Sequence, residues 1–386
     1  MMLIKIAWRN IWRSKKRSII LAVAISLGLW TGIFLIAFYN GMIEQRVDSA
    51  IRTEISHIQL HHPEFKKDHD IKFTISDGYE TLQKCQSPNQ VHSASARLIL
   101  QGMVSSSAGS HGVFINGIIP KQENLLTRLE DKLITGNYFS NDGTNEIILS
   151  QKLVHKLKLN LHKKAIITFQ DHQGNLASAA FRIKGIFKTN NSPYDETNVF
   201  VQINDIDSLA GVKGEINEIA LLLHSNETLN ETANQLKQKF KHLEIKNWME
   251  IAPEIGFTVS AGSQMVYIYM GIILLALAFG IINTMMMSVL ERTREIGMLL
   301  SLGMNKMRIF AMILLETFFL ILAGCPVGIL LAFVSIGITQ QTGIDFSHFS
   351  EVYSSFGYSS VIYPSLKSDQ FITILLMVIF TAIISS

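Results

Sequence analysis

Hydrophobic residues in this chain are gathered into long blocks that charged residues rarely interrupt. A helix needs roughly 20 predominantly apolar residues to cross the hydrocarbon core of a bilayer. Four blocks are therefore candidate transmembrane helices: residues 18–40, 265–290, 309–338 and 371–386. The last block is short for a span, which predicts that the natural protein continues past Ser386. We expect four transmembrane helices, one followed by three.

A signal peptide is the alternative for the first block, because Lys15, Lys16 and Arg17 form a basic flank before it. Its apolar stretch is longer than the usual 7–15 residues of a signal peptide, and no small-residue cleavage site occurs at Tyr39–Glu44. The first block is therefore predicted to stay in the membrane.

The long segment between the first two blocks, residues 41–264, has the composition of a soluble domain, with 23 Lys and Arg against 25 Asp and Glu. Alternating and β-branched runs predict strands, and period-3.6 runs predict helices. The predicted strands are Thr53–His62, Glu146–Leu149, Ala165–Gln170, Ala179–Phe187 and Asn198–Ile203, with a hairpin turn at Asp171–Asn175 and helices at Ser150–Leu157 and Leu229–Phe240. The predicted fold class is an α+β membrane protein with a large extracytoplasmic α+β domain between helices 1 and 2.

Basic residues set the expected orientation, since Lys and Arg concentrate on the cytoplasmic side of membrane proteins. Residues 1–17 carry six of them and residues 291–308 carry four, whereas residues 339–370 carry only Lys367. Both termini and the 291–308 connection are therefore expected in the cytoplasm. Residues 41–264 and the 339–370 loop are expected on the other side.

Residues 3–13 have the pattern of an amphipathic helix within the cytoplasmic segment 1–17. Trp8 and Trp12 share its apolar side, while Arg9 and Arg13 lie on the basic side. Such a helix suits the headgroup layer of a membrane. The alternative is an ordinary basic flank without a fixed helix.

Composition narrows the function classes. Charged residues make up 17% of the chain, against about 25% in soluble domains, and the net charge of +3 gives no case for nucleic-acid binding. Cys85 and Cys325 are far apart in sequence, so we expect no structural disulfide. No phosphate-binding G-x-x-x-x-G-K-[ST] loop occurs, so this chain is not expected to bind or hydrolyse ATP.

Eleven of the 12 histidines fall within residues 41–264, and His57, His61, His62 and His69 lie close in sequence. In a strand, His57 and His61 would be about 13 Å apart, and neighbouring His61 and His62 would point to opposite faces. We therefore predict solvated histidines and no metal site. The Ser-rich stretch Gly102–Gly112 has no nucleophile-elbow spacing and is predicted to be a flexible turn, so no catalytic residue is predicted.

Glu316 is a carboxylate inside an apolar block, where it is costly unless paired or hydrated. Asn283 lies at a similar expected depth in the preceding block. The two side chains are predicted to meet as intramembrane polar groups. A structural contact and a role in conformational switching both stay open.

The segment Asn283–Gly303, with the sequence NTMMMSVLERTREIGMLLSLG, passes from an apolar span into a charged helical stretch without Pro or Gly at the junction. It closely resembles the signature of the MacB/FtsX-like ABC transporter permease family. The family's other features match Ala7–Ser18, Glu146–Leu159, Phe181–Phe187 and Asp195–Ile203. Residues Gly343–Pro364 look most like the lipoprotein-releasing LolC/LolE-type branch.

The resemblance implies a non-catalytic permease subunit of a bacterial inner-membrane transporter, with its large domain on the periplasmic side. Its partners would be a separate P-loop ATPase that holds ATP and Mg, a second permease copy or paralogue, a periplasmic protein or lipoprotein, and membrane lipid. Residues Glu291–Leu302 would form a cytoplasmic coupling helix that Gly303 ends. The implied coupling residues are Glu291, Arg292, Arg294, Glu295, Ile296, Gly297, Met298, Leu299 and Gly303.

The implied function is ATP-driven movement of the periplasmic domain that extracts or releases lipoprotein or another lipid-embedded substrate. One alternative is a transmembrane mechanotransmitter that activates a periplasmic partner such as a cell-wall hydrolase. Another is a sensor anchor without an ATPase. The cargo, the direction of transfer and the choice between homodimer and heterodimer stay open.

Overall fold

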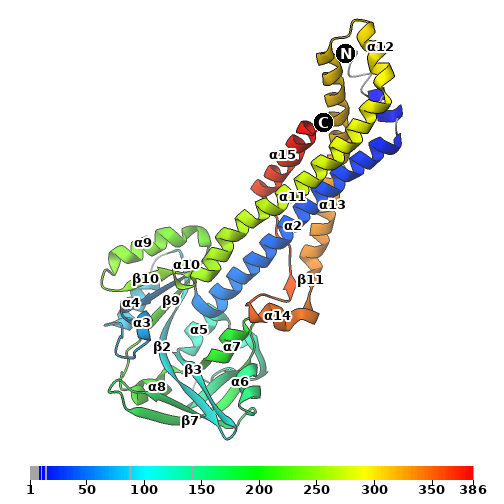
Figure 1. The fold of residues 1–386 in the computed structure, drawn as a ribbon. Helices are drawn as coiled ribbons and strands as arrows, with labels where there is room; N and C mark the ends of the chain where they lie inside the picture. The colour runs from blue at the N-terminus through cyan, green and yellow to red at the C-terminus, as the bar shows by residue number, and fades with distance from the viewer. Residues whose placement is uncertain (1–7, 10, 14, 87–88, 141–142, 386) are drawn as a thin grey trace. The chain divides into compact units, whose positions relative to one another are not determined.

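The computed structural model describes residues 8–9, 11–13, 15–86, 89–140 and 143–385. The chain divides into two compact units (Figure 1). We call residues up to 44, 259–346 and 361–386 the helical unit, and residues 45–258 together with 347–360 the sheet unit.

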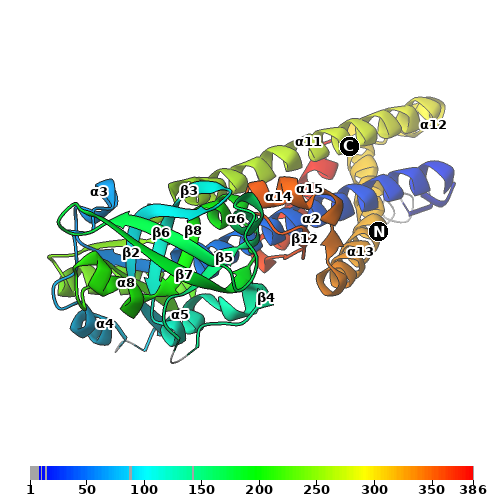
Figure 2. The same ribbon diagram turned by 90° about the horizontal axis from the view of Figure 1, so that it is seen from below.

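Helices build the helical unit (Figure 2), and most of them are long and apolar. They are α2 (Lys15–Ala50), α11 (Pro253–Glu291), α12 (Thr293–Ser301), α13 (Lys306–Thr342) and α15 (Ser368–Ile384). Among the described residues, three helices are long and apolar enough to cross a membrane: residues 18–55, 253–291 and 306–342. The apolar helix α15 has 17 residues, so its role as a fourth span stays a prediction.

Helices α2 and α13 pack with their backbones close together. The hydroxyl of Ser26 donates a hydrogen bond to the carbonyl oxygen of Gly324 at 2.8 Å, and the indole of Trp30 donates to Ser335 Oγ at 3.0 Å. A Cβ atom on Gly328 would lie 2.7 Å from the carbonyl oxygen of Ser26. Small residues at such a crossing allow the close approach that drives helix association in lipid.

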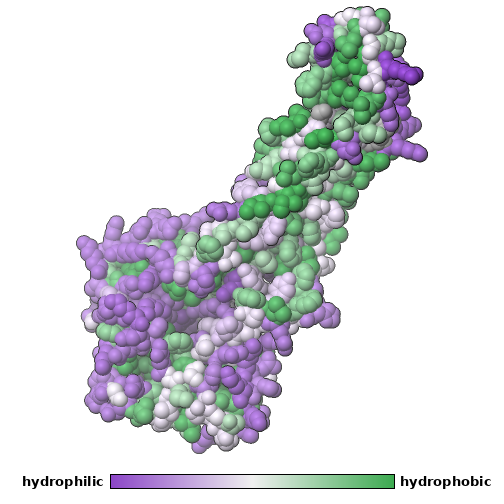
Figure 3. All heavy atoms as spheres, viewed as in Figure 1, coloured by the Kyte–Doolittle hydropathy of each residue, from purple (hydrophilic) through white to green (hydrophobic). Residues whose placement is uncertain are grey.

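The surfaces of the helices carry many exposed hydrophobic side chains, which Figure 3 shows as green along the helical unit. The exposed fraction of Phe279 is 70% and that of Leu330 is 61%. Soluble proteins seldom expose large contiguous apolar patches, so these faces are suited to lipid. The protein is a membrane protein.

One mixed sheet, with ten strands among the described residues, forms the core of the sheet unit. The strands are β1 (Ile58–His61), β2 (Val91–Ser106), β3 (Gly109–Ile118), β4 (Leu133–Gly136), β5 (Glu146–Ser150), β6 (Lys164–Gln170), β7 (Leu176–Phe187), β8 (Asn198–Gln202), β9 (Glu218–Leu223) and β10 (Glu244–Asn247). Their order is β10-β1-β9-β2-β3-β8-β5-β7-β4, with β6 between β2 and β7. The pairs β3–β8 and β5–β7 are parallel, and the others are antiparallel.

Short helices connect and cover these strands. They are α3 (Phe65–Asp68), α4 (Gly78–Gln86), α5 (Pro120–Thr127), α6 (Gln151–Lys156), α7 (Ser192–Thr197), α8 (Ile203–Ala210), α9 (Leu229–Lys239) and α10 (Trp248–Ile251). The predicted mixture of strands and helices is confirmed. Strands β5 to β8, helices α6 and α9 and the β6–β7 turn, where the Asp171 amide donates to the Asn175 carbonyl at 2.8 Å, all occur where the sequence predicts them.

The predicted strand Thr53–His62 is wrong over its first half. Helix α2 runs to Ala50 and continues as a π-helical turn through Ile55, and the turn ends at Ser56, whose φ is 60°. Only Ile58–His61 forms a strand, which pairs with β9 on one edge and β10 on the other, and all four of its residues are buried.

The Ser-rich stretch Gly102–Gly112 is also different from the prediction. Strand β2 runs through Ser106 and β3 begins at Gly109, so the turn is confined to residues 107–108. The serines therefore belong to a regular hairpin, in which Ser105 pairs with Ser110.

The connection between α13 and α15 contributes to both units. Strands β11 (Ile344–Asp345) and β12 (Val361–Ile362) pair in the helical unit. The intervening residues 347–360, with helix α14 (Ser350–Ser355), belong to the sheet unit. There the hydroxyl of Ser354 hydrogen-bonds that of Ser192 at 3.0 Å.

Candidate functional site

Helix α12 is a short helix between two long apolar helices, and its ends are defined by specific residues. At its start, Arg292 leaves helical geometry, with φ −101° and ψ 14°. At its end, the Gly303 amide donates to Leu300 and the Met304 amide to Leu299, both at 3.0 Å. With Gly303 at φ +89°, these bonds form a Schellman C-cap. The prediction that Gly303 ends the helix is confirmed. The helix expected over Glu291–Leu302 is found over Thr293–Ser301, because Arg292 interrupts it although no Pro or Gly lies at the junction.

The break at Arg292 turns its side chain toward α13. Arg292 Nη1 lies 3.0 Å from one carboxylate oxygen of Glu316 and 3.4 Å from the other. The side chains are largely buried, with exposed fractions of 14% and 9%. Charges removed from water in this way are costly unless paired, so this bond offsets part of the cost of burying the two groups.

Glu316 was expected to meet Asn283, but the structure gives it Arg292 as a partner. Asn283 lies on an exposed face of α11. The sequence could show that Glu316 needs a polar partner. It could not show that the junction after Glu291 breaks and directs Arg292 inward.

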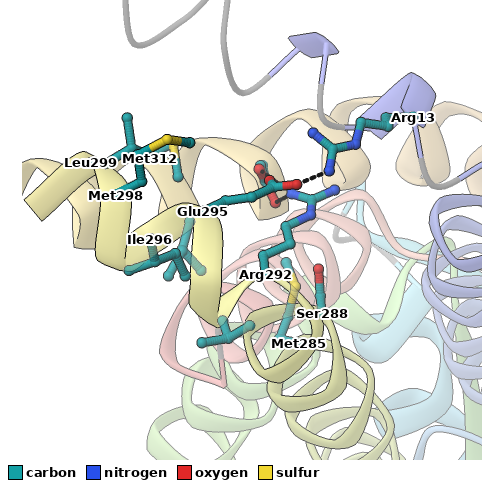
Figure 4. Close-up of a pocket in the computed structure, with 12 residues that line it drawn as sticks. Arg13, Met285, Ser288, Arg292, Glu295, Ile296, Met298, Leu299 and Met312 are labelled. Atoms are coloured by element: carbon teal, nitrogen blue, oxygen red, sulfur yellow. Dashed lines mark hydrogen bonds and ion pairs between the residues drawn. The ribbon is translucent and has the colours of Figure 1, made fainter.

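A second ion pair joins the N-terminal helix to α12. Arg13 bonds Glu295 (Figure 4), and both side chains are substantially exposed. This bond lowers the pKa of Glu295 and raises that of Arg13. Exposed pairs contribute little to stability, so we take this one as a positioning contact.

A cavity of about 310 Å³ lies beside these ion pairs (Figure 4). Helices α11, α12 and α13 line it, together with Arg13. Its lining residues are Arg13, Met285, Ser288, Val289, Arg292, Glu295, Ile296, Met298, Leu299, Met312, Ile313 and Glu316. Methionine side chains adapt to irregular partners, and three of them line this cavity. The lining residues that the sequence did not predict have the pattern of ordinary span residues; they are Met285, Ser288, Val289, Met312 and Ile313.

The predicted coupling residues divide into two groups. Arg292, Glu295, Ile296, Met298 and Leu299 all line the cavity, and the first is largely buried. Glu291, Arg294, Gly297 and Gly303 are exposed and outside it. Met298 and Leu302, with exposed fractions of 58% and 78%, give α12 an apolar outer surface.

The predicted N-terminal amphipathic helix lies partly outside the described residues, which exclude residues 3–7 and 10. In the described part, residues 8–9 and 11–13 are helical, and Trp8, Arg9, Trp12 and Arg13 are exposed. The Trp8 ring lies 5.5 Å from that of Phe319 in an edge-on contact. The Ser18 hydroxyl donates to the Ile11 carbonyl at 2.9 Å, which fixes the turn into α2.

The sheet unit contains a buried ionic cluster that sequence reasoning missed. Arg97 bonds Glu123 at 2.6 Å and Glu218 at 2.8 Å, and His61 Nε2 lies 2.8 Å from Glu218. Burial alone would raise the pKa of Glu218, but Lys66, His61 and Arg97 lower it well below its usual range. These residues lie between positions 61 and 218 of the sequence without a shared motif. They meet because β1, β9 and β2 are neighbours in the sheet and helix α5 supplies Glu123.

The prediction of solvated histidines is wrong for His57 and His61, which are buried. The Leu223 amide donates to His57 Nδ1 at 3.1 Å, and burial lowers the pKa of His57 to about 4. Within the described residues, no group of three or more His, Cys, Asp or Glu side chains is arranged to hold a metal ion.

Comparisons with known proteins agree with this architecture. Residues 267–386 match the family model FtsX-like permease C-terminal. The chain is 31% identical over 173 residues to the uncharacterized ABC transporter permease MJ1507 of Methanocaldococcus jannaschii, covering 42% of this chain and 43% of that relative. It is 22% identical over 340 residues to the lipoprotein-releasing system transmembrane protein LolC of Neisseria meningitidis serogroup B. This match covers 83% of this chain and 79% of that relative.

Among solved structures, the periplasmic region of MacB from Actinobacillus actinomycetemcomitans is similar, with 14% identity and a TM-score of 0.38, covering 55% of this chain and 97% of that chain. The comparisons indicate no enzyme family. Residues 267–386 therefore resemble the C-terminal part of FtsX-like permeases, and the chain is similar to ABC transporter permeases.

Proposed function

We propose that this protein is the non-catalytic permease subunit of an ATP-driven transporter in a bacterial inner membrane. The chain binds no cofactor. A separate P-loop ATPase holds ATP and Mg and pushes on α12, and a second permease copy or paralogue completes the membrane part. The sheet unit stands on the periplasmic side and moves in response.

The observation that carries this proposal is the character of α12. It is capped at its end and joined to its neighbours by two ion pairs, yet it exposes Met298 and Leu302 among charged residues. An apolar surface rimmed by polar groups is typical of a protein interface. A soluble partner that covers this surface would act on both adjoining long helices.

We propose lipoprotein or another lipid-embedded molecule as the cargo. Support comes from the relative of Neisseria meningitidis, which is named for lipoprotein release and aligns with 83% of this chain.

The test of the ATPase partnership is copurification from native membranes. The full chain is expected to bring down a P-loop ATPase and vanadate-sensitive ATP hydrolysis. Arg294→Glu and Met298→Asp are expected to reduce the recovered ATPase about tenfold, the effect of about 1.4 kcal/mol of lost contact. These two positions are chosen because neither side chain is part of the buried Arg292–Glu316 pair.

Lys241→Glu is the matched control, since Lys241 is exposed in the sheet unit. Full recovery of the ATPase with Arg294→Glu and Met298→Asp would contradict the role of α12. For the cargo, spheroplasts that contain the complex and ATP are expected to release lipoprotein. ATP-dependent activation of a cell-wall hydrolase without lipoprotein release would instead favour the mechanotransmitter.

A further inference from the structure

Glu316 is the only charged residue of α13 beyond its first turn. Between Arg308 and the end of the apolar stretch at Ile336 lie 28 residues, and Glu316 is the only one of them with a charged side chain. Its side chain is 9% exposed. Such a group persists in an apolar helix when a specific partner compensates its charge.

Its partner Arg292 occupies the one residue between α11 and α12. This position decides the direction in which α12 leaves α11, because the helical hydrogen bonding changes there. The Arg292 amide donates to the Val289 carbonyl oxygen, and the Ile296 amide donates to the Arg292 carbonyl oxygen. A bond from the Arg292 side chain to a neighbouring helix therefore fixes the junction itself.

The lengths of the helices explain why Glu316 is the residue that reaches this junction. Helix α12 has nine residues and advances about 13 Å at the usual rise. Residues 302–305 then turn the chain into α13. Glu316 lies ten positions after Lys306, so the helix returns about 15 Å and brings the carboxylate back to the level of Arg292.

We propose that Glu316 is the positioning residue of α12. Through Arg292 it anchors the α11–α12 junction to α13, so that a displacement of α12 moves α11 and α13 together. The effect of this anchor on ATP-driven movement rests on the proposed function, but the anchoring itself is a property of the chain alone. The adjoining cavity of about 310 Å³ gives α12 room to tilt when the anchor is released.

The anchoring is tested in the full chain without any ATPase. Spin labels are placed on α12 at Ser301→Cys and on α11 at Phe279→Cys, both exposed positions, in nanodiscs of phosphatidylethanolamine and phosphatidylglycerol. A narrow distance distribution is expected for the otherwise unchanged chain and a broad one for Glu316→Gln. The exchange Arg292→Glu with Glu316→Arg is expected to restore the narrow distribution.

The matched control is Glu44→Gln. Glu44 forms an exposed ion pair with Lys367 at 3.2 Å within the same unit, and its loss is expected to leave the α12 distances unchanged. An unchanged distribution in Glu316→Gln would overturn the inference. The inference would also be overturned if the charge-exchange variant folds, as judged by its melting temperature, but its distance distribution remains broad.

The functional consequence is measured separately with the copurified ATPase. Glu316→Gln is expected to bind the ATPase within about twofold of the unaltered chain. Its permease-dependent ATP hydrolysis is expected to fall about tenfold. The charge exchange is expected to restore this hydrolysis. If the unaltered chain recruits no ATPase, the proposed function fails while the anchoring stands on the distance measurements. Equal loss of binding and turnover would identify Arg292 as part of the docking surface and overturn the positioning role.

Discussion

At the scale of single residues, His57 links the stability of the sheet unit to pH. The ring is buried and accepts a hydrogen bond from the Leu223 amide, and burial lowers its pKa to about 4. In the unfolded chain the same ring titrates near 6.5. The neutral ring therefore stabilises the folded state fully above pH 6.5, and this stability is lost as the pH falls from 6.5 through about 4.

We expect acidification across this window to destabilise the sheet unit by roughly 3 kcal/mol through His57. Hydrogen exchange of peptides covering β1 and β9 measures this, with the unaltered chain and His57→Gln compared at each pH so that intrinsic exchange rates cancel. Gln offers an acceptor to Leu223 but does not titrate, so its pH dependence is expected to be shallower. Parallel curves for the two proteins would contradict the assignment.

The residue scale also shows where sequence reasoning stops. A lone carboxylate in an apolar block is visible in sequence, and its need for a partner was predicted correctly. The identity of the partner depends on the non-helical geometry of Arg292, which no Pro or Gly marks. Similarly, the sequence does not show that Arg97, Glu123 and Glu218 meet in the core, where the neighbouring strands β2 and β9 supply two of these residues and helix α5 supplies Glu123.

At the scale of elements, the packing of α2 against α13 depends on glycine at a few positions. A Cβ on Gly328 would lie 2.7 Å from the Ser26 carbonyl oxygen and 3.1 Å from its Cα, and backbone atoms cannot move aside as a flexible side chain can. Gly328→Ala is therefore expected to force the helices apart and to destabilise the helical unit by about 1–3 kcal/mol.

Gly337→Ala, in the same helix, is the control for this substitution. Its Cβ would have no atom within 4 Å, so the change is expected to be neutral or to stabilise by up to about 1 kcal/mol through helix propensity. The measurement is the melting temperature of each variant in the same detergent. Equal melting temperatures would show that the α2–α13 contact tolerates separation.

The sequence predicts helices and strands well where the local pattern of residues determines the structure. It predicts them less well where contacts with neighbouring elements determine it. The β6–β7 hairpin has a clear turn sequence and occurs as predicted. The segment Thr53–His57 alternates like a strand, yet it continues the helical path of α2 as a π-helical turn. All four residues of β1 are buried, so both of its faces are covered, and alternation in the sequence cannot reveal two covered faces.

At the scale of the whole molecule, the orientation in the membrane rests on the distribution of Lys and Arg. The sheet unit is expected outside the cytoplasm, and the turn between α12 and α13 is expected inside. The proposed partnership with an ATPase requires this arrangement, because ATP is available on the cytoplasmic side. Single cysteine substitutions at exposed lysines, Lys241→Cys in the sheet unit and Lys306→Cys at the start of α13, test it directly.

The chain suits this experiment because its own thiols, Cys85 and Cys325, are both buried. Burial raises the pKa of Cys85 to about 11, and the thiolate is the reactive form, so background labelling is expected to be low. A membrane-impermeant maleimide applied to intact spheroplasts is expected to label Lys241→Cys at once and Lys306→Cys only after the membrane is permeabilised. Labelling of Lys306→Cys in intact spheroplasts would put α12 on the side without ATP, and the ATPase could not then act on the Arg292–Glu316 junction.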